Sequence, residues 1–492
     1  MMHPALKLVW IIATILSRDK WSSDFGEWFR NILLEAEVMD YRYPIKGCGV
    51  WMPYGFKIRK YVLQIMRDLL DSTGHYEVLF PTLIPETLLS KESQHIRSFE
   101  GECLWVTHGG FEELKIRYAL RPTSETAMTP MIKLWVRSHK DLPIKIYQVV
   151  SIFRHETKAT RPILRMREVA TFKEAHTFHA SAEEADKQVW EAVEIYKRFF
   201  DELCVPYIIS KRPDWDKFAG AEYTIAFDMI CPDGRTLQIG TAHNLGQNFG
   251  KAFNVTFEKP DGTHEYVWQT SYGISGRAVA APIIMHGDDR GMVLPPKIAP
   301  VQVIVIPIPY KGFEEKVEET AKSVAEKLKA ASIRAELDLR PDITPGSKFY
   351  FWEMKGVPVR IEIGPRDVER KEVTLVRRDT LERSTCKVEE VVSAVKLLME
   401  EITKSLKERA WSWMRERIRK VYDAKEARKL LQNKFGVVEV PWCGDDDCGL
   451  KMEELLDARL VGIPVDTKEK PSGNCIVCGK PAKIFVRAAA TY

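Results

Sequence analysis

The stretch SIFRHETKATRPILRMREVATFKEAH, residues 151–176, decides how the largest part of this chain folds. The run that leads into it, residues 144–153, is rich in β-branched and aromatic residues, and a second strand-like run follows at 168–172. Between them lies the polar, basic segment TKATRP, which carries a turn-forming proline. The stretch therefore predicts two strands joined by a loop, with Arg154 near the end of the first strand and Arg165 where the chain turns back.

Helical and strand-like runs surround this hairpin over about residues 24–294. Apolar residues at spacings of three and four predict helices near 25–33, 58–70 and 182–203. Runs of β-branched and aromatic residues predict strands at 77–85, 223–229, 236–239 and 255–257. Pro81 interrupts the first of these strands. The mixture indicates an α+β domain whose sheet is rich in antiparallel strands.

The segment LPPKIAP, residues 294–300, is the best candidate for a linker, because its prolines break both helix and sheet. The apolar run VQVIVIPI directly after it is typical of a strand that is buried on both faces. Helix-like and strand-like runs then alternate, at 314–331, 334–339, 349–354, 359–363, 373–377 and 388–406. This alternation predicts a small α/β domain.

Four of the nine cysteines gather near the C-terminus, after a helical region at 407–434 and the β-like run VVEVPW. Their spacing is Cys443-x4-Cys448, then 26 residues, then Cys475-x2-Cys478. Two close pairs can hold opposite sides of a tetrahedral ion, and four thiolates fill its coordination. The pattern therefore predicts a small α/β domain with a structural rather than a catalytic zinc. The alternative is four reduced thiols that never meet.

Length and composition set the outer limits. The 492 residues suffice for about three domains, and the net charge of +4 with 45% apolar residues excludes a disordered or polybasic protein. No run of about 18 apolar residues occurs, so no membrane-spanning helix is expected. Paired cysteines outside a disulfide framework indicate a reducing, cytoplasmic location. We predict an N-terminal extension and three domains, at residues 1–22, 23–296, 297–406 and 407–492.

Three motifs resemble those of the class II aminoacyl-tRNA synthetases. The hairpin with Arg154-x-Glu156 resembles motif 2, GISGR at 273–277 resembles motif 3, and GHYEVLFPTLIP with Pro81 resembles motif 1. Each match alone is weak, but the three stand in the family's order, about 70 and about 120 residues apart. The resemblance implies an antiparallel-sheet catalytic domain and a homodimer formed through motif 1.

A finer resemblance is to the prolyl-tRNA synthetases of the archaeal and eukaryotic type. It rests on RYPIKGCGVWMPYGFKIRK, RPTSET, FKEAH and GTAHNLGQNF, and continues with PGSKF, WEMKGVPVRIEIGPRD and VRRDT. It covers about residues 24–492 and implies an α/β anticodon-binding domain and a C-terminal zinc-binding domain. The bacterial type carries an editing insert between motifs 2 and 3. Only about 100 residues separate Phe172 from Ser271 here, so we expect no editing domain.

The resemblance implies a proline–tRNA ligase that activates L-proline with ATP and Mg²⁺ to prolyl-adenylate and then charges tRNA(Pro). The catalytic arginines would be Arg154, at the α-phosphate and the proline carboxylate, and Arg277, at the far phosphates and the adenine face. Arginine suits these positions because it stays charged and its fork fits both anions. The remaining ATP contacts implied are Glu156, Arg165, Met166, Gln238, Thr241 and Ser275. Gln238 and Thr241 would help to hold Mg²⁺, although Gln238 could instead be a sheet-surface residue.

The resemblance also implies a proline pocket. Thr123 and Glu125 in RPTSET match the pair that accepts the two protons of the proline amine. Phe172 and His243 match the walls of the ring pocket, with Arg154 at the carboxylate, although His243 could be an ordinary buried histidine. One missing methylene changes binding by only about 1–3 kcal/mol, so alanine or cysteine could be misactivated.

For tRNA, the TKATRP loop with Lys158 and Arg161 is the expected acceptor-stem contact. Glu353 and Arg360 match positions that read the guanines of a proline anticodon, and the alternative is a surface ion pair. The terminal Tyr492 is expected to bring its carboxylate near the catalytic domain. Two functional alternatives stay open: another class IIa synthetase such as the threonyl enzyme, which would need a catalytic zinc, and a non-catalytic tRNA-binding paralogue.

Overall fold

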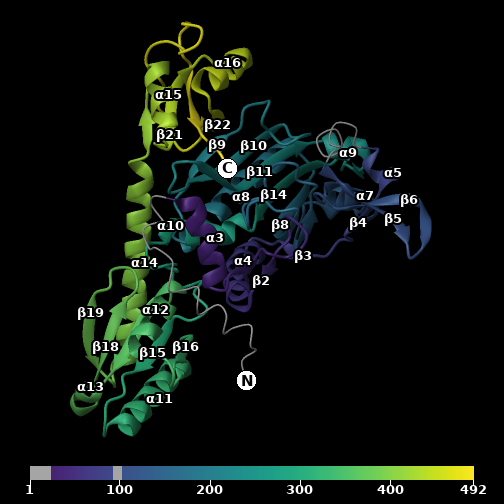
Figure 1. Ribbon diagram of the computed structural model, residues 1–492. Coiled ribbons are helices and arrows are strands. Elements are labelled where there is room, and N and C mark those ends of the chain that lie inside the picture. Colours follow the sequence, from purple (N-terminus) through teal and green to yellow (C-terminus); the bar gives the residue numbers. More distant parts are fainter. Residues whose placement is uncertain (1–23, 92–101) are drawn as a thin grey trace.

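The computed structural model describes residues 24–91 and 102–492, so the predicted extension at residues 1–22 lies outside the described residues. Figure 1 shows an elongated molecule, with a large sheet in the middle, an α/β domain at one end and a small C-terminal domain at the other. The long helix α14, Val391–Arg415, joins the two end domains. Within the described residues, no helix combines the length and the apolarity that crossing a membrane would need.

The central sheet has 11 strands in the order β20-β21-β23-β22-β9-β10-β11-β14-β8-β7-β3. Its middle strands are β7 (Ile144–Phe153), β8 (Glu168–His179), β9 (Ile208–Lys211), β10 (Tyr223–Ile230), β11 (Thr236–Gly246) and β14 (Trp268–Ser275). From β9 to β7 every neighbouring pair is antiparallel, which confirms the predicted antiparallel-rich α+β domain. The predicted hairpin is β7 and β8, but β8 runs seven residues further than predicted, to His179, because its second half is buried on both faces.

Helices cover one face of this sheet. They are α3 (Phe25–Glu35), α4 (Pro53–Asp71), α8 (Ala182–Glu202) and α10 (Arg277–His286). The helix α8 packs directly on β8, β11 and β14, and its apolar stripe places Tyr196 5.6 Å and Phe200 5.7 Å from the ring of Phe227. This apolar layer fixes the sheet from below, so the opposite face of its central strands is free to form a site.

The strand predicted at 77–85 is split into two. Pro81 lacks an N–H, and the chain leaves the sheet there. Its two parts are β3 (Tyr76–Glu77), at the end of the large sheet, and β4 (Leu83–Pro85), in a three-stranded sheet with β5 (Leu104–Gly109) and β6 (Glu112–Leu120). Short elements complete the domain: β1 (Met39–Asp40), β2 (Val50–Trp51), α5 (Glu86–Leu89), α7 (Glu125–Trp135), α9 (Asn248–Ala252), β12 (Thr256–Glu258) and β13 (His264–Tyr266).

The second unit is the predicted α/β domain. Its sheet has the order β16-β15-β17-β18-β19, with the first three strands parallel and the last two antiparallel. The strands are β15 (Val303–Pro307), β16 (Ala335–Leu337), β17 (Val359–Ile363), β18 (Glu372–Arg377) and β19 (Arg383–Lys387). The helices are α11 (Glu314–Ala330), α12 (Pro345–Met354), α13 (Pro365–Arg370) and the first part of α14. As the apolar run VQVIVIPI predicted, β15 is buried on both faces, and it lies inside the sheet between β16 and β17.

The C-terminal unit differs from prediction in two respects. The continuous helix predicted for 407–434 is wrong, because α14 ends at Arg415 and a strand precedes the next helix. The elements are β20 (Ile418–Lys420), α15 (Ala424–Gln432), β21 (Val437–Trp442), α16 (Asp446–Leu456), β22 (Arg459–Pro464) and β23 (Ile484–Ala489). Second, β22 pairs with β9, so this unit extends the catalytic sheet instead of standing apart. The proposed boundary at residue 407 falls inside α14 and stays a prediction.

Candidate functional site

A cavity of about 350 Å³ opens on the face of the sheet opposite α8, between the β7–β8 hairpin and the start of α10. Its size suits a nucleotide-sized ligand. It brings together every residue that the sequence predicted to bind proline or ATP: Thr123, Glu125, Arg154, Glu156, Arg165, Met166, Phe172, Gln238, Thr241, His243, Ser275 and Arg277. Segments that are far apart in the chain meet here because β7, β8, β14 and β11 are consecutive neighbours in the sheet.

One end of the cavity carries the buried pair Thr123 and Glu125. Glu125 begins α7 and is 2% exposed; its carboxylate accepts from Thr123 Oγ1 and, at 3.0 Å, from Ser271 Oγ. The helix N-terminus also favours a negative charge there. Two hydroxyl donors therefore hold a carboxylate that faces the cavity, which is a suitable acceptor for an ammonium group.

His243 forms part of the wall beside this pair. Its Nδ1 lies 2.8 Å from Thr224 Oγ1, and its ring packs against Phe218 with centroids 4.7 Å apart and an interplanar angle of 34°. Burial lowers the pKa of His243 to about 4, so the ring is neutral at pH 7. A neutral imidazole can pack against the apolar ring of a ligand. His243 is buried, as the alternative interpretation expected, but it also lines the cavity.

Glu174 and His176 lie deeper at this end and were missed from the sequence. Both are buried on β8; Gln148 Nε2 donates to Glu174 Oε1 at 3.0 Å, and Ser124 Oγ donates to the same oxygen. Burial opposes a charge on His176, but the nearby Glu125 and Glu174 outweigh it, so its pKa is raised. The period of two along a strand places 172, 174 and 176 on one face, and this signal was present in FKEAH.

Arginines gather at the other end of the cavity. Arg154 Nε donates to Pro122 O at 3.3 Å, while Arg277 donates through Nε to Leu164 O at 2.8 Å and through Nη1 to Gln238 O at 3.2 Å. Burial, and then the like charges of Arg165 and Arg154, lower the pKa of Arg277 to about 10. Arg277 therefore stays charged at pH 7, and an anion bound between these arginines would relieve their mutual repulsion. This end is preorganised for phosphate.

Glu156 and Arg165 face each other across the loop, with Arg165 Nε 3.8 Å from Glu156 Oε2. Arg167 lies on the same loop, and its guanidinium donates to the Glu156 carbonyl at 3.3 Å. The side chain of Met166 is buried beneath the cavity. Thr241 and Ser275 lie on β11 and β14, where both strands border the cavity.

Glu353 and Arg360 meet in the α/β domain. Arg360 Nη1 donates to Glu353 Oε1 at 2.6 Å and its Nε donates to Glu362 Oε1 at 2.9 Å, while Arg290 Nη1 reaches Glu353 Oε2 at 3.1 Å. The pair is about nine-tenths buried, so the ion pair considered as the alternative is present, although it is not a surface pair. A role in reading the anticodon stays a prediction.

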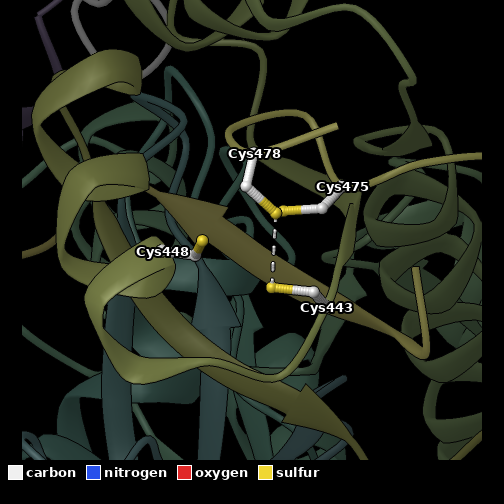
Figure 2. A group of neighbouring side chains, drawn as sticks. All are labelled: Cys443, Cys448, Cys475 and Cys478. Carbon is white, nitrogen blue, oxygen red and sulfur yellow. Dashed lines mark hydrogen bonds between the residues drawn. The ribbon is translucent and has the colours of Figure 1, made fainter. Parts of the chain in front are cut away.

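The four C-terminal cysteines converge, as the spacing predicted. They come from the end of β21 (Cys443), from α16 (Cys448) and from the loop before β23 (Cys475 and Cys478), and Figure 2 shows their side chains turned toward one another. The four sulfur atoms all lie within 4.8 Å of one another, and Cys443 Sγ is 3.8 Å from Cys478 Sγ. Sulfur atoms around a tetrahedral zinc, at about 2.3 Å from the metal, stand about 3.8 Å apart. The donor set and its spacing therefore fit zinc.

The terminal Tyr492 docks on the catalytic domain through its backbone and side chain. Its N–H donates to Thr236 O at 3.0 Å and its hydroxyl to Asp233 Oδ2 at 2.6 Å. The guanidinium groups of Arg161 and Arg235 lie 4.7 and 4.6 Å from its ring centroid. Arg161 belongs to the predicted acceptor-stem loop, so the chain terminus reaches the rim of the site.

An antiparallel sheet with this motif 2 hairpin, an arginine-lined cavity and an α/β appendage defines an aminoacyl-tRNA synthetase of class II. Family comparisons agree. Residues 105–285 match the tRNA synthetase class II core domain (G, H, P, S and T), 302–398 the anticodon binding domain, and 424–492 the C-terminal domain of prolyl-tRNA synthetase.

Relatives that match nearly the whole chain are proline–tRNA ligases. The proline–tRNA ligases of Metallosphaera sedula and Pyrococcus abyssi are 56% and 53% identical, with 97% of this chain and 100% of each relative covered. The solved structure of Giardia lamblia prolyl-tRNA synthetase in complex with prolyl-adenylate superposes with a TM-score of 0.92 at 36% identity, covering 97% of this chain and 99% of that one. The chain belongs to the prolyl-tRNA synthetase (proline–tRNA ligase) family, in its archaeal and eukaryotic type.

The alternatives are thereby resolved. The threonyl enzyme was expected to need a catalytic zinc held by cysteine and histidine. Among the described residues, the group near the cavity that could hold a metal is Glu125, Glu174 and His176, which contains no cysteine. Against a non-catalytic paralogue, the relatives that match 97% of this chain are proline–tRNA ligases, and the predicted Arg154 and Arg277 are both present in the cavity.

Proposed function

We propose that the cavity binds L-proline at the Glu125 end and ATP at the arginine end, joins them as prolyl-adenylate, and releases pyrophosphate. The observation that carries this assignment is that one cavity holds a buried carboxylate at one end and three charged arginines at the other. A secondary ammonium and a triphosphate have the complementary charges. The Giardia relative was solved with prolyl-adenylate, and a Cryptosporidium parvum prolyl-tRNA synthetase, at 35% identity with a TM-score of 0.91 over 96% of both chains, was solved with halofuginone and AMPPNP.

The chemistry asks for positioning and charge stabilisation. A proline carboxylate oxygen attacks the α-phosphorus while the bond to pyrophosphate breaks. The nucleophile is already ionised, so no protein base is needed. Arg154 is placed to hold the carboxylate and the α-phosphate together, which lowers the entropic barrier, and Arg277 to stabilise charge on the leaving phosphates. Thr123 and Glu125 accept the two amine protons, with Phe172 and His243 beside the ring.

We propose two metal ions with different tasks. Zinc at Cys443, Cys448, Cys475 and Cys478 would be structural, since four thiolates leave no open coordination position. Mg²⁺ would enter with ATP and neutralise phosphate charge, held mainly by phosphate oxygens and water, with Thr241 at hand. The predicted role of Gln238 as a magnesium ligand is weakened, because its amide oxygen already accepts from Arg212 at 3.0 Å.

In the second step the 3′-terminal adenosine of tRNA(Pro) would take the prolyl group and release AMP. Lys158 and Arg161, both exposed on the β7–β8 loop, are suited to contact the acceptor stem. The test is charging of tRNA(Pro) with radiolabelled proline, with tRNA(Ala) as the control. We expect stable prolyl-tRNA(Pro) only; charging of both tRNAs alike, or of neither, would refute the assignment.

We propose that two copies pair through the motif 1 region. The strand β3 is the last strand of the large sheet, and Tyr76, Leu79 and Leu83 next to it are 74%, 80% and 45% exposed. An unpaired edge beside large apolar side chains favours association. Sedimentation should give twice the 56.6 kDa of one chain, and Leu79→Glu should give the single chain; a wild-type monomer would contradict the proposal.

We also propose a cytoplasmic location, where tRNA is charged for protein synthesis. None of the nine cysteines is joined in a disulfide, which suits a reducing compartment.

A further inference from the structure

Arg212 is a buried arginine at the edge of the cavity that no sequence motif singled out. It directly follows β9 and is 6% exposed. Its Nη2 donates to Asp228 Oδ1 at 2.8 Å and to Gln238 Oε1 at 3.0 Å, and its Nη1 donates to the carbonyl of Val461. One guanidinium thus joins β10, β11 and β22, the last of which belongs to the C-terminal unit.

The bond to Gln238 determines how that side chain faces the cavity. A guanidinium is only a donor, so the amide oxygen of Gln238 must be the atom that faces Arg212. The amide nitrogen is then the atom left for a partner elsewhere. Gln238 lines the cavity, and its own backbone carbonyl accepts from Arg277. Gln238 is therefore held through its side-chain oxygen by Arg212 and through its backbone carbonyl by Arg277. Its amide nitrogen is left as a donor, which suits an acceptor oxygen of a nucleotide.

The C-terminal unit supplies one anchor of Arg212, beside Asp228, Gln238 and an ion pair of its Nε with Asp216 Oδ2 at 3.7 Å. Strand β22 pairs with β9 at Ile463↔Lys211 and Pro464↔Ser210, which brings the Val461 carbonyl to the guanidinium. The approach is close: Gly462 has φ +121°, and a Cβ there would stand 2.4 Å from the Lys211 carbonyl oxygen. The two strands can lie this close only because residue 462 is glycine.

We propose that Arg212 is a positioning residue for ATP: the C-terminal unit, through Val461 and Arg212, fixes the Gln238 amide as a hydrogen-bond donor to the bound nucleotide. The inference rests on the proposed use of the cavity for ATP and extends it, because it gives the C-terminal unit a part in the first reaction. Arg212 itself need not touch the nucleotide; its effect passes through Gln238.

The test is a double-mutant cycle in proline-dependent ATP–pyrophosphate exchange. Arg212→Lys keeps a buried cation but loses the fork, and Gln238→Met loses the amide. Each single variant should raise the KM for ATP about tenfold, the effect of losing one hydrogen bond to a charged ligand, with little change in the KM for proline. The double variant should be no worse than Gln238→Met alone, because both changes remove the same contact.

Arg459→Met is the matched control. Arg459 also joins β22 to the catalytic domain, 3.5 Å from Asp216, but it is 56% exposed. It should leave the KM for ATP unchanged. Gly462→Ala, which separates β22 from β9, should raise the KM for ATP in the wild-type background and not in the Gln238→Met background.

Multiplying effects in the double variant, or an equal rise in the KM for proline, would overturn the inference. So would an unchanged KM for ATP in Gln238→Met that still activates proline, and the proposed function would then stand. Absence of proline-dependent exchange in the wild type would instead refute the proposed function. Thermal unfolding of each variant separates misfolding from mispositioning.

Discussion

Arg154 and Arg277 hold their charges partly buried and close to each other, which is costly without an anion between them. Burial lowers the pKa of both. Nearby carboxylates such as Glu125 partly offset this effect for Arg154, whereas the charges of Arg165 and Arg154 lower the pKa of Arg277 further. The site therefore stores electrostatic repulsion that ATP, bound as proposed, would relieve. In this account the two arginines act through the planar fork of their guanidinium groups as well as through charge.

Arg154→Lys and Arg277→Lys should each lower kcat/KM for proline-dependent pyrophosphate exchange by about a hundredfold or more, because lysine keeps the charge but cannot bind two oxygens in parallel. Arg42→Lys is the control, since Arg42 is 69% exposed and pairs only with Asp40 at the surface. Near-wild-type rates for either cavity variant, with unchanged thermal unfolding, would contradict the assigned roles.

At the residue scale the sequence motifs predicted the site well. The nine residues drawn from RPTSET, FRHE, FKEAH, GTAHNLGQNF and GISGR line one cavity, together with the predicted Arg165, Met166 and Gln238. Glu174 and Ser271 were missed because each looked like an ordinary strand residue beside a recognised one. Arg212 could not be found, because its importance comes from a backbone carbonyl of β22, more than 200 residues away in the chain.

The strand β8 shows how one element serves both faces of the sheet. Phe172 and Glu174 line the cavity and His176 lies on the same face of the strand, while Lys173 points into the layer below. Lys173 is fully buried; its Nζ donates to Tyr196 OH at 3.0 Å and to Tyr272 O at 3.2 Å. Burial lowers the pKa of Lys173 to about 7, against the modest support of Glu174.

This shift predicts a pH dependence of stability. Unfolded lysine keeps its proton up to about pH 10.5, whereas folded Lys173 releases it above pH 7. Between these values the unfolded state binds more protons, so the free energy of unfolding should rise with pH, by up to about 1.4 kcal/mol per unit. Urea unfolding from pH 7 to 9.5 should show the rise in the wild type and in the exposed control Lys187→Met. A rise of the same slope in Lys173→Met would contradict the assignment.

The cysteine cluster links α16, β21 and the loop before β23, and these strands belong to the catalytic sheet. Plasma emission should therefore find one zinc per chain. Cys448→Ser should lower the free energy of unfolding by about 3 kcal/mol or more. The reason is that zinc binds only the folded protein, so its binding free energy adds to the stability of the fold. Cys386→Ser, on β19 and outside the cluster, is the control. Zinc-free protein that is as stable as zinc-loaded protein would contradict the proposed zinc site.

At the scale of the whole molecule, the α/β domain touches the catalytic domain just beyond α10. Arg378 binds both carboxylate oxygens of Asp288 at 2.6 Å, and its Nε donates to the Glu353 carbonyl at 2.8 Å. Arg290, two residues after Asp288, pairs with Glu353. The predicted anticodon pair is thus packed against the segment that follows the motif 3 helix, and a guanine bound there would compete for Glu353.

Arg360→Ala should lower kcat/KM for charging tRNA(Pro) by about 10- to 100-fold, the range for losing one guanine contact, and leave pyrophosphate exchange without tRNA unchanged. Arg383→Ala is matched to it, because Arg383 pairs with the same Glu362 but is 57% exposed. Equal losses in charging and exchange would show that Arg360 supports the fold and does not read the anticodon.

The global architecture was only partly predictable. The three units followed from the motif 2 stretch, the VQVIVIPI strand and the cysteine spacing, since each is a local pattern. The pairing of β22 with β9 could not be predicted from the sequence. These strands meet through backbone hydrogen bonds, which any sequence with strand propensity can form. The interruption of the helix predicted for 407–434 depends likewise on β20 pairing with β21.

The central claim is that this cavity selects proline for adenylation, and ATP–pyrophosphate exchange without tRNA, run with each of the twenty amino acids, tests it most directly. The account predicts exchange with proline far above the others, with weak secondary exchange for alanine or cysteine, since a lost methylene costs only about 1–3 kcal/mol. Exchange with a different amino acid alone, or none from folded, zinc-loaded protein, would contradict it.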